Sequence, residues 1–98
     1  MDRSVLSFHD KPAEWIEAEA SVRFGGIADG QTVVFLFSGE ALRWLASRGD
    51  VPLDGAGALT IFAELQDVIR SIALQEWEMG GGLYRTFKIG WLTSERLP

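Results

Sequence analysis

The clearest pattern along the chain is a pair of strand-like runs separated by two turn residues. Residues 21–28 begin with alternating apolar and polar positions, and residues 31–37 are almost wholly apolar. Asp29 and Gly30 lie between them. A two-residue type I′ turn needs a positive φ at both central positions, which Asp tolerates and Gly adopts freely. The pattern therefore predicts a β-hairpin with Asp29–Gly30 at its tip and residues 32–37 paired with residues 21–28.

The second of these runs is apolar on both of its faces. Because side chains alternate along a strand, Val33, Phe35 and Phe37 point to one face of the sheet. Val34 and Leu36 point to the other face. A strand with two apolar faces is typical of the centre of a sheet that is covered on both sides.

Two helices follow in the pattern. Ser38 is a good N-cap for a helix over residues 39–47, because its hydroxyl can accept a hydrogen bond from a free backbone N–H. Residues 50–57 form a loop rich in Gly and Asp. A long helix is then predicted over residues 58–79, since its apolar residues recur at steps of three and four, namely Phe62, Leu65, Ile69 and Ile72.

The remaining segments are shorter. The pattern predicts a short edge strand at residues 4–8 and a weak helix at residues 12–19 that starts at Pro12. It also predicts a half-buried final strand at residues 83–92. Together these elements predict one α+β domain over residues 1–98. Its small antiparallel sheet consists of the N-terminal strand, the Asp-Gly hairpin and the C-terminal strand. One long and one short helix pack on this sheet, with the long helix over Phe35, Phe37, Phe87 and Ile89.

Three consecutive glycines, residues 80–82, raise the question of a phosphate-binding loop. Such a loop follows a strand and precedes a helix, so that helix N–H groups face the anion. Here the order is reversed, and the negative end of the predicted helix faces the glycines. We therefore interpret Gly80 as the left-handed residue that ends the helix near Met79, and the next two glycines as the chain reversal, and we expect a positive φ at Gly80 or Gly81.

Composition narrows the possible functions. The chain has 98 residues and a net charge of −5, and its nine basic residues are scattered, which argues against a nucleic-acid partner. No apolar run reaches the ~18 residues of a membrane helix, and the N-terminus lacks the features of a signal peptide. The chain has no cysteine, which fits a cytoplasmic protein and excludes disulfides and thiolate chemistry. We expect no cofactor and no metal.

Candidate catalytic residues are few. His9 is the only histidine, and with Asp10, Glu14 and Trp15 it forms the one segment where a small-molecule pocket or an enzyme site is conceivable. A solvated turn is the simpler interpretation of these residues. The stretch around Ser38 is not a nucleophile elbow, because Leu36 and Glu40 occupy the two positions where that motif needs glycine.

Several short features occur together in an order that resembles a known family. They are the Phe8 segment with Trp15, Val22-x-Phe24, Asp29-Gly30, Ser38-x-Glu40-Ala41-Leu42, the long helix with Ile69 and Ala73, and Leu92-Thr93-Ser94. The family is that of small bacterial proteins known as domain of unknown function 1488. The resemblance implies an α+β fold and a bacterial, cytoplasmic source. It implies no activity and no site residues. The three glycines at residues 80–82 depart from what we expect of the family.

These observations favour a non-enzymatic protein that works through protein contacts, including contacts with a second copy of itself. The predicted helices are too few to cover both faces of the sheet, so Val34 and Leu36 would lie on the less covered side. Trp15 and Trp44 are further candidates for this interaction surface. In the competing arrangement, residues 12–19 fold back over the sheet and use Trp15 and Ile16 as a lid, which needs no partner.

Overall fold

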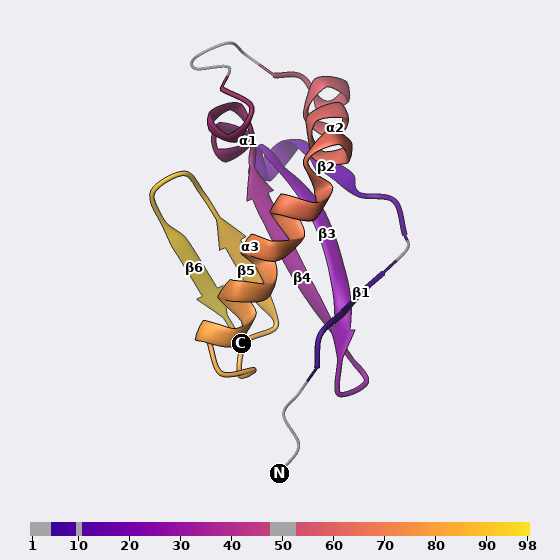
Figure 1. Cartoon of the computed structure of the whole chain (residues 1–98), viewed down its shortest axis with the longest axis vertical. Helices are drawn as coiled ribbons and strands as arrows, with labels where there is room; N and C mark the ends of the chain where they lie inside the picture. The colour runs from indigo at the N-terminus through magenta and orange to yellow at the C-terminus, as the bar shows by residue number, and fades with distance from the viewer. Residues whose placement is uncertain (1–4, 10, 48–52) are drawn as a thin grey trace.

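The computed structural model describes residues 5–9, 11–47 and 53–98, which form one mixed sheet with helices on one of its sides (Figure 1). The sheet has six strands. Five of them follow the order β1-β3-β4-β5-β6, and the sixth, β2, also pairs with β3. The strands are β1 (Ser7–Phe8), β2 (Glu14–Ile16), β3 (Ser21–Ala28), β4 (Gln31–Ser38), β5 (Thr86–Ile89) and β6 (Ser94–Leu97). The helices are the 3-10 helix η1 (Glu17–Glu19), α1 (Gly39–Leu45), α2 (Gly55–Glu64) and α3 (Gln66–Met79).

β3 and β4 form an antiparallel hairpin. Their register runs from Ser21 opposite Ser38 to Ala28 opposite Gln31. Asp29 has φ 54° and Gly30 has φ 74°, so both turn residues have the positive φ that a type I′ turn requires. The hairpin provides the two longest strands of the sheet.

The sheet is not antiparallel throughout, and the sequence-based prediction is wrong on this point. β4 and β5 run parallel, with Phe35 opposite Phe87 and Phe37 opposite Ile89. The reason is the path of the chain between them. α3 runs back along the sheet to the end where β4 begins, so that β5 starts beside the start of β4 (Figure 1). β6, which the sequence did not predict as a separate strand, then turns back antiparallel to β5.

The predicted long helix is two helices. α2 ends at Glu64 and α3 begins at Gln66, and the backbone hydrogen bonds continue across Leu65, whose N–H donates to Ile61 O at 2.9 Å. No Pro or Gly marks this joint, which is why the apolar pattern does not reveal it. α2 also begins at Gly55, earlier than predicted, because the N–H of Gly57 donates to Oδ1 of Asp54 at 2.7 Å. Residues 50–52 of the predicted loop lie outside the described residues.

Residues 12–19 are not a helix. Instead Glu14–Ile16 pairs with β3, and only Glu17–Glu19 forms a short 3-10 turn. Pairing with the hairpin gives this segment its backbone hydrogen bonds and outweighs its weak local helix signal. Of the predicted edge strand at residues 4–8, Ser7–Phe8 is a strand, and Ser4 lies outside the described residues.

α3 ends at Met79, where the sequence predicts its end. The N–H of Gly82 donates to Trp77 O at 3.4 Å and the N–H of Gly81 to Glu78 O at 3.0 Å, which is a Schellman motif. The left-handed residue of this motif is Gly81, with φ 70°, and not Gly80, which has φ −80°. The glycines therefore close a helix, and the positive φ expected at Gly80 or Gly81 is found at Gly81.

The core lies between the sheet and the helices. Phe24, Phe35 and Phe87 are neighbours across three strands, with ring centroids 5.3 Å and 5.1 Å apart, and Phe62 of α2 lies 5.0 Å from Phe24. The helices and strands contribute further buried residues, which include Val22, Val33, Phe37, Leu42, Ile61, Ile69, Ala73, Trp77 and Ile89. The predicted final strand at residues 83–92 contributes only its middle to this core.

Candidate functional site

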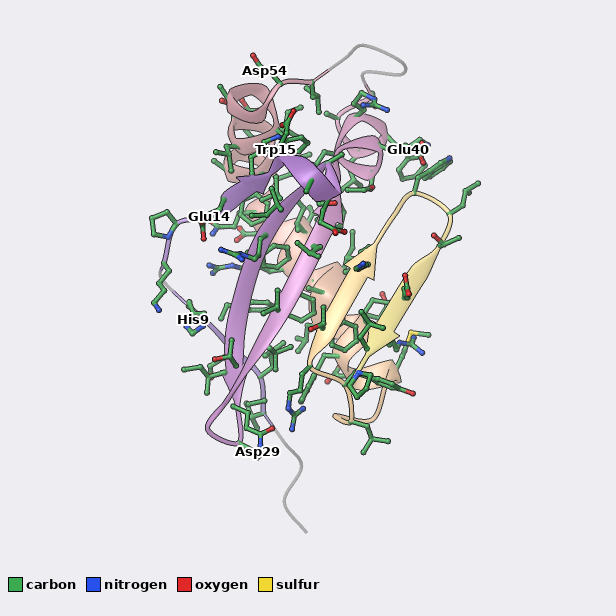
Figure 2. All side chains as sticks on the ribbon, turned by 180° about the vertical axis from the view of Figure 1, so that it is seen from behind. His9, Glu14, Trp15, Asp29, Glu40 and Asp54 are labelled. Atoms are coloured by element: carbon green, nitrogen blue, oxygen red, sulfur yellow. The ribbon has the colours of Figure 1, made fainter. Side chains whose placement is uncertain are left out.

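The face of the sheet away from the helices is the most extended feature that the fold leaves open. From behind, the strands of the hairpin and of the C-terminal pair lie in front, and α2 and α3 lie beyond them (Figure 2). On β4, Val33, Phe35 and Phe37 are buried toward the helices, while Val34 and Leu36 are half-buried on the other face. We call this other side the open face. Its further apolar members are Ile16, Ile27 and Leu97.

Charged residues surround the apolar centre of the open face. The register places Arg23 and Lys88 on either side of Leu36, with Glu14 beyond Arg23 and Glu95 beyond Lys88. One cross-strand row therefore reads negative, positive, apolar, positive, negative. Arg23 Nη2 lies 2.7 Å from Oε1 of Glu14, and both side chains are about half exposed to solvent. Ion pairs this exposed hold their partners only weakly.

One end of the open face is partly covered by η1. Glu19 of η1 reaches Lys88, with 3.5 Å between Oε1 and Nζ. Ile16 lies on the open face and is half-buried. The segment mainly extends the sheet through β2, and of the two predicted lid residues only Ile16 lies on the open face.

Trp15 lies on the opposite side of the sheet from the open face. It pairs with Val22, which is fully buried. Its indole ring packs where α1 and α2 begin, because a Cβ added at Gly39 or Gly55 would lie 3.3 Å or 2.9 Å from it. The indole N–H donates to the Glu17 carboxylate. Trp15 therefore belongs to the packing of the helices, and the fold does not bring it to Val34 and Leu36.

Trp44 lies on α1, and its side chain is 53% exposed. It contacts Trp91 of the turn between β5 and β6, with 3.9 Å between ring centroids. Leu92, 79% exposed, follows in the same turn. The sequence predicts Trp44 as a surface residue but not its contact with Trp91, because only the return of the chain through β5 brings Trp91 to α1.

The four residues considered for a small-molecule pocket do not converge. The backbone of His9 bonds to β3 and α3, Glu14 pairs with Arg23 on the open face, and Trp15 faces the helices. Figure 2 shows His9, Glu14 and Trp15 spread along one edge of the molecule. Asp10 lies outside the described residues. No acid–base pair forms among the three residues that the structure does describe.

A hollow nevertheless lies beside this segment. It is lined by Lys11, Pro12 and Ala13 on one side and by the α2–α3 joint on the other, where Gln66 and Arg70 supply the polar groups. Sequence analysis missed Lys11 and Arg70, which are far apart in the chain and carry no local motif.

Within residues 5–9, 11–47 and 53–98, no three His, Cys, Asp or Glu side chains are grouped so that they could hold a metal ion. In the same part of the chain, no helix has the length and apolar character needed to cross a membrane.

A family model described as "Protein of unknown function (DUF1488)" matches residues 6–85. The chain belongs to this family. The match confirms the resemblance seen in the sequence and extends from the segment before β1 to the residue before β5. The Leu92-Thr93-Ser94 feature lies beyond the matched residues. No curated protein and no solved structure matches the chain.

Proposed function

We propose that this protein is a non-enzymatic interaction module that pairs with a second copy of itself through the open face of its sheet. The observation that supports the proposal is the apolar pair Val34 and Leu36 at the centre of a sheet face that, among the described helices, only the short η1 covers, and only in part. A bacterial, cytoplasmic setting is part of this proposal and rests on the family resemblance and the absence of cysteine.

Burial of apolar area favours such a pairing. Removing a Val or Leu side chain from water contributes roughly 1.5–3 kcal/mol when burial is complete, and both residues are already half-buried in one copy. A symmetric pair brings together Val34, Leu36 and Leu97 from each copy. Large apolar patches are uncommon on soluble monomers and often mark protein contacts.

The charges around this apolar centre favour a second copy of the chain over a partner whose surface carries charges of only one sign. Arg23 and Lys88 are flanked by Glu14, Glu19 and Glu95, so the open face carries both signs. A copy shifted by one strand places one cation of each copy opposite a carboxylate of its partner. A strongly acidic or strongly basic partner would meet like charges on the same surface.

The decisive experiment is a mass measurement by light scattering at micromolar concentration, with the full chain and two variants. We expect a dimer mass for the natural sequence and a monomer mass for Leu36→Glu, because a carboxylate at the centre of the contact would be buried without a partner. Val68→Glu is the matched control, since Val68 is also apolar and 48% exposed but lies on α3.

A monomer mass for the natural sequence would overturn the proposal, as would a dimer that Leu36→Glu leaves intact. Circular dichroism of each variant checks that it is folded. If Val68→Glu also gives a monomer while remaining folded, the contact lies on the helices and not on the open face.

A further inference from the structure

The hollow at the α2–α3 joint is separate from the open face, because the sheet lies between them. Its volume is about 360 Å³, within the range of small-molecule sites. Pro12, Phe62 and Ala63 contribute apolar lining, while Lys11, Gln66 and Arg70 contribute polar atoms. An apolar wall with a few polar groups at one side is the usual composition of a ligand site.

The guanidinium of Arg70 is held in place by an aromatic ring and a backbone oxygen. Its Cζ lies 5.2 Å from the centre of the Phe8 ring, and its Nη2 donates to the backbone oxygen of His9 at 3.2 Å. Its Nε is shut off from solvent and has no hydrogen-bond acceptor among the described residues. A cation stacked on an aromatic ring in this way is already oriented before a ligand arrives.

The described lining of the hollow carries positive charge, although the protein is acidic overall. The net charge of the chain is −5, yet no Asp or Glu is among the described lining residues. Among the described residues, Arg23, Lys88 and Arg96 form ion pairs with carboxylates, whereas Lys11 and Arg70 form none. Two unneutralised cations beside an apolar wall favour an anion that carries an apolar body.

We propose that this hollow binds a small amphipathic carboxylate. Its carboxylate lies between Lys11 and Arg70, and the Gln66 side-chain amide can donate a further hydrogen bond to it. Its apolar body lies against Phe62 and Pro12. A carboxylate suits this site because a guanidinium offers N–H groups in a planar fork that matches two carboxylate oxygens.

The test is a titration of the full ¹⁵N-labelled chain followed by NMR, with 2-naphthoate as the probe and 2-naphthamide as its neutral counterpart. We expect 2-naphthoate to shift the amide signals of residues 59–70. We expect 2-naphthamide to bind at least about tenfold more weakly, because it lacks the charge. Inorganic phosphate, which lacks the apolar body, should also bind more weakly than 2-naphthoate.

Variants locate the site. Lys11→Met and Arg70→Met should each weaken 2-naphthoate binding about tenfold, while Arg43→Met on α1 should leave it unchanged. Lys11 is exposed, so its variant remains informative even if Arg70→Met weakens the fold. Equal binding of the acid and the amide, equal binding of phosphate, unchanged affinity in Lys11→Met, or shifts confined to other residues would each overturn the proposal. The open-face dimer can fail without affecting any of these results.

Discussion

Several glycines in this protein allow either the close packing of a neighbouring side chain or an unusual backbone conformation. Trp15 packs where two helices begin because Gly39 and Gly55 have no side chains in its way. Gly81 has a different role. It has φ 70°, and a Cβ added there would meet nothing within 4 Å. Any effect of a side chain at Gly81 therefore comes from the backbone conformation and not from crowding.

Replacing Gly81 with Val should lower the free energy of unfolding by on the order of 1 kcal/mol or more, because a β-branched side chain strains the left-handed region. Urea unfolding followed by tryptophan fluorescence measures the change. Gly81→Asn is the control and should lose less, since Asn tolerates this region better than other residues. Equal stability of the Val variant and the natural protein would contradict the proposed cap.

At the scale of elements, the starts of α1 and α2 each depend on one polar side chain. Ser38 accepts a hydrogen bond from the N–H of Ala41 at 3.0 Å, and Asp54 caps α2 through Gly57 at 2.7 Å. The second cap matters more, since the sequence of α2 begins with two glycines in three residues, which favour a helix poorly. We infer that Asp54 holds the first turn of α2 in place beneath Trp15.

Asp54→Ala should destabilise the protein by about 0.5–2 kcal/mol, because it leaves a backbone N–H of α2 without its acceptor. Thermal unfolding measures the loss. Glu64→Ala at the other end of α2 is the control and should change stability by less than about 0.5 kcal/mol, as expected of an exposed residue without a cap. Comparable losses in both variants would mean that the cap contributes little.

At the scale of the whole molecule, α2 and α3 lie on one side of a six-stranded sheet and leave most of the other side open. The helix side carries the aromatic core and the carboxylate site that we propose. The open side carries Val34, Leu36 and the charged residues around them. The two sides are separated by the sheet, so the proposed self-association and the proposed ligand binding can be tested independently.

If the native protein is a dimer, its melting temperature must rise with concentration, because dilution favours the unfolded monomers. Over a hundredfold range of concentration we expect a rise on the order of several degrees. Leu36→Glu should melt at one temperature throughout that range. A natural protein whose melting temperature is independent of concentration would argue against the dimer.

The sequence by itself determined the features that depend on residues close together in the chain. The positive φ of Asp29 and Gly30, the cap at Ser38 and the end of α3 near Met79 each follow from a few neighbouring residues. The two apolar faces of β4 follow from alternation alone. Local backbone conformation is governed largely by such neighbours, and these features can therefore be read before the fold is known.

The tertiary structure alone decided which distant segments meet. Phe35 and Phe87 lie in parallel strands because α3 returns the chain across the sheet, and nothing near either residue encodes that path. The same holds for the strand at Glu14–Ile16, whose partners come from β3. It holds also for Lys11 and Arg70, which line one hollow. Such contacts depend on which apolar surfaces can be buried together, and that is a property of the whole chain.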